Sequence, residues 1–175
     1  SAGANATICS GSTYTLAGTR GGSATSSTWT TFGDGIFDNP ALLNATYTPG
    51  IFDITMGNVT LVITTDDPPG SCTAASDTMV LTIDPAATVN AGIDDTICKN
   101  STYVLSGTIG GGATSSVWTT SGSGTFNDSS LLAAIYTPSL ADIAMGNVTL
   151  TLTTDDPDGT GPCLPGSSVL SDPAR

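Results

Sequence analysis

The sequence predicts an all-β protein made of two tandem β-sandwich domains. An internal repeat divides the 175 residues into two similar halves. Short runs rich in threonine, valine and isoleucine, which favour pleated strands, alternate with turns rich in Gly, Asp and Pro. Glu and Gln are absent and Lys and Arg total 3, so most long-chain helix formers are missing.

The repeat appears when the chain is compared with itself at an offset of 89 residues. Residues 7–70 align with residues 96–159 without a gap, and 41 of the 64 aligned pairs are identical. The second copy then carries two extra residues before Cys163, which aligns with Cys72. We expect one domain over residues 1–86 and a second over residues 87–175.

Each copy has the pattern of short strands joined by tight turns. Val59, Leu61 and Ile63 alternate with mostly threonine, as expected for a sheet with one face buried and one in water. About 88 residues with several such strands predict a small β-sandwich. The strands expected in the first copy are Thr13–Ala17, Ser27–Thr31, Leu42–Tyr47, Val59–Thr65 and Thr78–Ile83.

Charge excludes several classes of partner. All 15 acidic residues are aspartate, there is no histidine, and the net charge is −12. Such a chain cannot neutralise phosphates, so we expect no nucleic acid partner and no binding to anionic membranes. No stretch approaches the roughly 20 apolar residues of a membrane-spanning helix, so we also expect no membrane insertion.

The four cysteines predict one disulfide in each domain. Repeat symmetry favours Cys9 with Cys72 and Cys98 with Cys163, out of three pairings that four cysteines allow. Four buried free thiols in a reducing compartment are the alternative. A disulfide pattern favours an oxidising, extracellular location.

The ends of the chain resemble its internal junction. Residues 169–175 followed by residues 1–3 repeat much of the sequence that connects the copies through Ala87–Gly92. We therefore expect a window of a longer tandem array, or a subunit that polymerises head to tail by strand addition to the next molecule. Chance similarity in a biased composition is the alternative. The expected partners are adjacent repeats or further copies of the same chain.

Several motifs resemble the polycystic-kidney-disease-type (PKD) immunoglobulin-like domain. The first copy has Trp29-Thr30-Thr31-Phe32-Gly33-Asp34-Gly35, followed by Tyr47-Thr48-Pro49-Gly50. The second copy is looser, because Ser121 replaces Phe32 and Ser123 replaces Asp34. The whole unit is similar to tandem PKD-like repeats of secreted surface proteins of Bacteroidota, with Val89–Cys98 and Gly107–Thr120 carrying the pattern almost in full.

That resemblance implies a cell-surface protein exported through the type IX system, an adhesin or a filament component. It also implies O-glycans on Ser or Thr that follow Asp and precede an apolar residue. Thr78 and Thr96 fit this pattern and are the expected glycosylation sites. Unmodified strand threonines are the alternative.

Paired aspartates are the candidate metal ligands. Asp66 and Asp67 recur as Asp155 and Asp156 in the equivalent loop, and carboxylates with loop carbonyls suit Ca²⁺. Ordinary turn chemistry is the favoured explanation of Asp-Asp-Pro, and no ladder of alternating aspartates is present. We expect no cofactor, with Ca²⁺ as the open alternative.

Catalysis is not expected, because a serine nucleophile would have no histidine base and the paired aspartates lie in repeated turns. The rival function is a module that binds carbohydrate or a host surface. Its spare aromatic residues are Phe32, Phe52 and Tyr14, since Trp29 and Trp118 fit a buried position.

Overall fold

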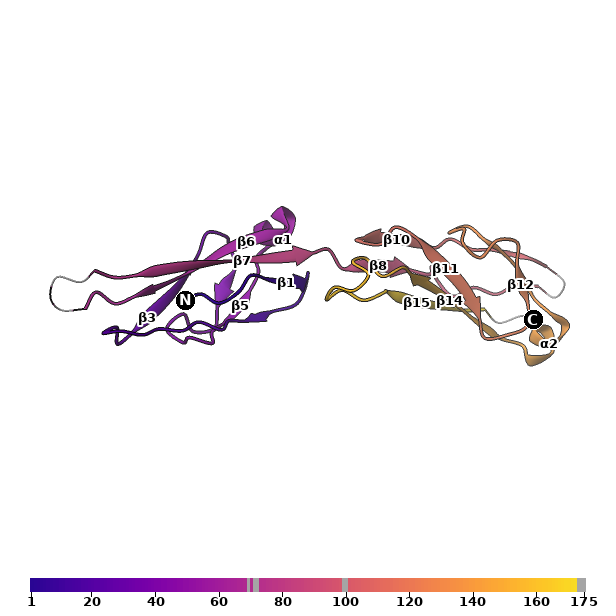
Figure 1. Ribbon diagram of the computed structural model, residues 1–175. Helices are drawn as coiled ribbons and strands as arrows, with labels where there is room; N and C mark the ends of the chain where they lie inside the picture. The colour runs from indigo at the N-terminus through magenta and orange to yellow at the C-terminus, as the bar shows by residue number, and fades with distance from the viewer. Residues whose placement is uncertain (69, 71–72, 99–100, 173–175) are drawn as a thin grey trace. The chain divides into compact units, whose positions relative to one another are not determined.

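The structure is a computed structural model, and it describes residues 1–68, 70, 73–98 and 101–172. Contacts divide the chain into two compact units (Figure 1). Unit 1 comprises Ser1–Pro85 with Thr160–Cys163, and unit 2 comprises Ala86–Gly159 with Leu164–Arg175. The domains expected over residues 1–86 and 87–175 stay a prediction. Unit 1 additionally includes a segment that belongs to the second copy in sequence.

Both units consist of short strands and one six-residue helix each. The elements of unit 1 are β1 (Ala6–Cys9), β2 (Tyr14–Thr15), β3 (Ser27–Thr31), β4 (Ile36–Phe37), β5 (Thr46–Thr48), α1 (Ile51–Met56), β6 (Asn58–Thr65) and β7 (Ser76–Asp84). Those of unit 2 are β8 (Ala87–Asn90), β9 (Tyr103–Val104), β10 (Thr108–Gly111), β11 (Ser116–Thr120), β12 (Thr125–Phe126), β13 (Ile135–Thr137), α2 (Leu140–Met145), β14 (Val148–Thr154) and β15 (Ser167–Asp172). This content confirms the all-β prediction.

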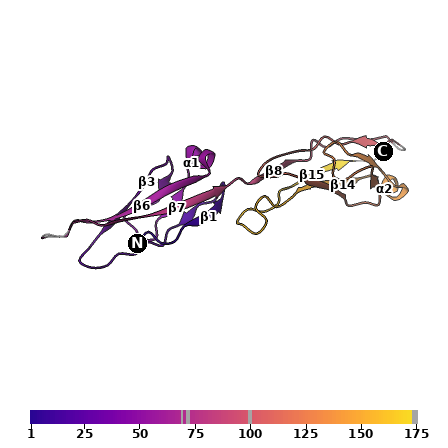
Figure 2. The same cartoon turned by 45° about the horizontal axis from the view of Figure 1, so that its top comes forward.

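In unit 1 the strands form a four-stranded sheet, β1-β7-β6-β3, and a three-stranded sheet, β2-β5-β4. The β1–β7 pair is parallel and its neighbours are antiparallel, with helix α1 beside β6 (Figure 2). Unit 2 contains the corresponding sheets β11-β14-β15 and β12-β13-β9, and the additional pair β10-β8.

The strand register is the same in both copies. Val59 pairs with Leu81 in unit 1, and the equivalent residues Val148 and Asp172 pair in unit 2. The two extra residues before Cys163 therefore lie in the loop and leave the pairing of the strands unchanged.

One apolar core lies in each unit, and both sheets contribute to it. Trp29 from β3 and Tyr47 from β5 pack in the first core, and Trp118 and Tyr136 take the equivalent places in the second. Both tryptophans are only 2% exposed, which confirms their expected burial. Within the described ranges, no helix is long and apolar enough to cross a membrane.

Two expectations about the elements are wrong. The strand predicted over Leu42–Tyr47 is a turn at its start, because the Asn39 carbonyl and side chain accept hydrogen bonds from Leu42 and Ala41, and only Thr46–Thr48 is extended. The connection Ala87–Gly92 was expected as a linker. Its residues Ala87–Asn90 instead form β8, which pairs with β10.

Candidate functional site

The disulfide joins the two sequence copies. Cys9, at the end of β1, is bonded to Cys163, with a Cα–Cα distance of 5.0 Å. Cys163 is 1% exposed and lies in the segment that groups with unit 1. The predicted pairs Cys9–Cys72 and Cys98–Cys163 are therefore both wrong. Cys98 is a free, exposed thiol, and Cys72 lies outside the described residues.

The parallel register of β1 explains why Cys9 does not bond within its own copy. Cys9 lies level with Asp84, the last residue of β7, whereas Cys72 precedes Ser76, the first residue of that strand. Ser76 and Asp84 are about 26 Å apart in an extended strand. The four residues from Cys72 to Ser76 reach at most ~14 Å, so the pair cannot close. Repeat symmetry predicted that the first cysteine of a copy bonds to a second cysteine, as Cys9 does with Cys163. It wrongly placed the two partners in the same copy.

A buried carboxylate organises the turn that carries the PKD-like motif. Asp53, on α1, is 1% exposed and accepts a hydrogen bond from the Tyr47 hydroxyl at 2.6 Å. The backbone N–H groups of Asp34, Gly35 and Gly50 also donate to it, at 3.1 to 3.2 Å. Neutral hydrogen-bond donors therefore compensate this buried carboxylate.

The two glycines of Gly33-Asp34-Gly35 are needed because of this close packing. A Cβ atom on Gly33 would lie 1.6 Å from the Asp53 carboxylate, and one on Gly35 would lie 2.4 Å from the Tyr47 hydroxyl oxygen. The motif resemblance identified these glycines, whereas Asp53, the residue whose position requires them, was not predicted as a site residue. The signal was present as an Asp three residues after Gly50, the spacing of a capping box.

The second unit keeps the buried carboxylate and changes its surroundings. Asp142 accepts hydrogen bonds from the Tyr136 hydroxyl at 2.8 Å and from the backbone N–H groups of Ser139 and Ser123 at 2.9 Å. Burial raises the pKa of Asp142, but these hydrogen bonds outweigh burial and lower it to about 2. Burial, with the neighbouring carboxylate, raises the pKa of Tyr136 to about 12.

Two neighbouring positions differ between the copies in a correlated way: Asp34 and Gly50 in the first copy are both serine in the second. In unit 1 the Asp34 carboxylate accepts from the backbone N–H groups of Phe52 and Asp53 and so caps α1, whose N-cap is Gly50. A Cβ on Gly50 would lie 2.1 Å from Asp34 Oδ1. In unit 2 both positions are serine, and Ser139 Oγ accepts from the Asp142 N–H and lies 2.6 Å from Ser123 Oγ. Each copy therefore has its own compatible cap.

The aspartates proposed as metal ligands tie loops together. Asp66 accepts hydrogen bonds from the Thr25 hydroxyl and N–H groups and from the Ser26 N–H. Asp155 does the same with Thr114 and Ser115. The Thr114 hydroxyl is the main cause that lowers the pKa of Asp155 to about 2.

No cluster of three or more potential metal ligands is present in the part of the chain that the structure describes. In the same loops lie the second members of the pairs, of which Asp67 is exposed and Asp156 is partly exposed. Ca²⁺ binding at these loops stays a prediction.

The expected glycosylation sites are both on the surface. Thr78, on β7, is exposed, and so is Thr96, which lies two residues before Cys98. Attachment of glycans to them stays a prediction.

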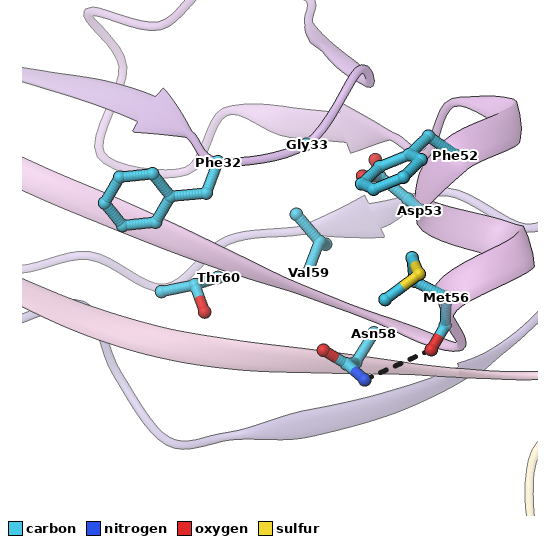
Figure 3. Close-up of a pocket in the computed structure, with 8 residues that line it drawn as sticks. All are labelled: Phe32, Gly33, Phe52, Asp53, Met56, Asn58, Val59 and Thr60. Atoms are coloured by element: carbon cyan, nitrogen blue, oxygen red, sulfur yellow. Dashed lines mark hydrogen bonds between the residues drawn. The ribbon is translucent and has the colours of Figure 1, made fainter.

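Two of the spare aromatic residues lie in one shallow pocket of unit 1 (Figure 3). Phe32 and Phe52 are 79% and 57% exposed, and Met56 completes an apolar rim around a volume of about 170 Å³. Asn58 from β6 and the backbone of Gly33 supply polar groups to the lining. Tyr14 is not part of this pocket, because it packs against the core.

Comparisons with known proteins identify the fold. No family model and no curated protein matches the chain. Among solved structures, the insect immune protein hemolin is similar with a TM-score of 0.59 and 11% identity, over 100% of this chain and 46% of hemolin. Drosophila N-cadherin EC1-4 matches with a TM-score of 0.45 and 13% identity, over 86% of this chain and 41% of that one. The chain spans less than half the length of either structure. The likeness to hemolin shows an immunoglobulin-like fold.

The paired exchange at the helix cap predicts a non-additive double mutant. Gly50→Ser should destabilise unit 1 by about 1 to 3 kcal/mol, because the new side chain clashes with Asp34 or displaces it from the helix. Asp34→Ser should also destabilise unit 1, because the hydrogen bonds that cap α1 are lost. The double variant recreates the Ser–Ser pair of unit 2, so its loss should be smaller than the sum, measured by urea unfolding.

Gly21→Ser is the matched control for that experiment, because a Cβ there meets nothing within 4 Å. It should leave the free energy of unfolding unchanged within error. Simple additivity of the two single variants would contradict the coupling between positions 34 and 50.

Stability should be flat near neutral pH and fall at both extremes. The lowered pKa values of Asp142 and Asp155, about 2, contribute stability above the unfolded value near 4 that is lost as the pH falls toward 2. The raised pKa values of Tyr47 and Tyr136, about 12, contribute stability below pH 10 that is lost as the pH rises toward 12. With no histidine, the melting temperature should be nearly constant from pH 5 to 8. A clear slope within that window, in calorimetric scans, would contradict this assignment.

Proposed function

We propose that this chain is a structural repeat unit of an extracellular surface protein or filament. Each unit is a PKD-like β-sandwich, and the chain spaces and displays other parts of the assembly and joins further copies of itself head to tail. No reaction is assigned to it, since its functional groups are used to hold the fold together.

The Cys9–Cys163 disulfide carries this proposal. It fixes the loop of the second sequence copy to unit 1, so consecutive copies are held together covalently. A bond of this kind persists in oxidising compartments such as the cell exterior. A chain of spacers benefits from such a link, because it adds a second covalent connection between consecutive copies.

The acidic composition supports the same role. A net charge of −12 keeps extended threonine-rich surfaces soluble and discourages side-by-side association of sheet edges. Hemolin, whose fold is similar, has a domain arrangement with implications for homophilic adhesion. A partner of the same kind, another copy of this chain, is what we propose here.

Electron microscopy of the protein as isolated from its source tests the proposal. The longest strands, β6, β7 and β14, have 8, 9 and 7 residues. With its loops each domain should span roughly 35 to 40 Å, so a two-domain building block gives filaments with an axial repeat of about 70 to 80 Å. Separate two-domain particles under the same conditions would refute head-to-tail assembly.

A second candidate function is carbohydrate binding at the pocket of Phe32 and Phe52. These two exposed rings lie on opposite sides of one pocket whose lining includes Asn58, and a sugar ring could stack on either of them and hydrogen-bond to the amide (Figure 3). The second copy has Ser121 and Ala141 at the equivalent positions, so the candidate site belongs to unit 1 alone.

The natural difference between the copies supplies the test variant. Phe32→Ser with Phe52→Ala should weaken retention on an array of bacterial and host glycans by about five- to 150-fold, because each stacked ring contributes about 0.5 to 1.5 kcal/mol. Leu140→Ala, which removes an 81% exposed side chain from α2, is the control and should bind as the natural chain does. Equal retention of all three proteins, or none by the natural chain, would remove carbohydrate binding from consideration.

A further inference from the structure

Cys98 occupies the same structural position as Cys9. Both follow Thr-Ile, and the isoleucines Ile8 and Ile97 are each 6% exposed. The backbone turn after each cysteine is also the same, because Ser12 N–H donates to the Cys9 carbonyl and Ser101 N–H donates to the Cys98 carbonyl, both at 3.0 Å.

The segments leading to the two cysteines are held to the neighbouring sheets by equivalent hydrogen bonds. Asn5 Oδ1 accepts from the Val80 N–H at 2.9 Å, and Asp94 Oδ1 accepts from the Ser171 N–H at 2.8 Å. The Cys98 segment is therefore held in place although Cys98 itself forms no disulfide. The difference is that Cys9 is bonded to Cys163, whereas Cys98 is free and exposed.

Cys163, the partner of Cys9, indicates which cysteine would pair with Cys98. Cys163 follows the Thr-Thr-Asp-Asp-Pro block of the next copy. In sequence, Cys72 follows the same block in the first copy, so it is the equivalent of Cys163. The observed rule is that the first cysteine of one copy bonds to the second cysteine of the copy that follows it.

We propose that Cys98 forms an intermolecular disulfide with Cys72 of a second copy of this chain, which extends the Cys9–Cys163 pattern from one molecule to the next. This inference rests on the proposed head-to-tail assembly and names its covalent joint. The net charge of −12 on each chain opposes association of the ends, and a covalent bond offsets that repulsion.

The bond forms by thiol–disulfide exchange with a small-molecule disulfide such as oxidised glutathione. The Cys98 thiolate attacks the small disulfide and releases one reduced thiol, and the Cys72 thiolate of the second chain then displaces the other. Two protein thiols are oxidised, one small disulfide is reduced to two thiols, and two protons are transferred to them overall.

The test uses the full chain with its Cys9–Cys163 bond intact, incubated with a mixture of oxidised and reduced glutathione. On a non-reducing gel the natural chain should give a ladder of multimers that a reductant collapses to monomer. Cys98→Ser alone and Cys72→Ser alone should each stay monomeric. A mixture of the two variants should give a dimer and nothing larger, because each supplies one of the two required thiols.

Tryptic mapping identifies the bond, since Arg20 and Lys99 are the internal cleavage sites of the sequence. The Cys9–Cys163 bond links peptide 1–20 to peptide 100–175 and is the internal control. The intermolecular bond should link peptide 21–99 of one chain to peptide 21–99 of another, with the fragments assigning Cys98 to Cys72.

Three results would overturn the proposal: dimers of either single variant alone, a peptide 21–99 closed on itself, or no ladder from the natural chain. If filaments of the expected repeat persist in the Cys98→Ser variant, head-to-tail assembly stands and the disulfide joint fails. If the ladder forms but no filaments are seen, the joint stands and the filament proposal fails.

Discussion

Fifteen aspartates with three cationic side chains place one constraint on this molecule: its carboxylates must be compensated almost entirely by neutral donors. Asp53 and Asp142 show the consequence most clearly, because they are buried and bonded to a tyrosine hydroxyl and to backbone N–H groups. Those donors have to converge on one carboxylate, which fixes the loop between β3 and β4 against the start of α1. The glycines of that loop follow from the requirement that its backbone approach the carboxylate closely.

The same constraint explains the surface loops. Asp66 and Asp155 each bind a threonine and a serine of a neighbouring loop, so residues that resemble cation ligands in sequence act as ties between segments. Sequence alone cannot separate these two roles, because both require exposed carboxylates near a turn. The distinction depends on which donors the fold brings within reach, and that is a property of the tertiary structure.

The sequence predicted what depends on local pattern and on the repeat. β3 was located residue for residue, and the longest strands, β6 and β7, were recognised from apolar alternation. The short helix α1 was missed because six residues carry too little periodicity. The disulfide was predicted within each copy, but it joins the two copies. A repeat indicates which positions are equivalent, whereas the distance between two cysteines depends on the register of the sheet.

The disulfide also determines how tension would pass through the chain. A force applied at residues 1 and 172 would run along the chain to Cys9, cross to Cys163 and continue to the end, so the 154-residue separation between these cysteines would be bypassed. Neither the buried carboxylates nor the long strand pairs of the first unit would lie on that path. If the bond were reduced, unravelling the bypassed segment would release roughly 500 Å of contour length. Under such a force, the Cys9–Cys163 bond would decide whether the stretched molecule lengthens or keeps its length.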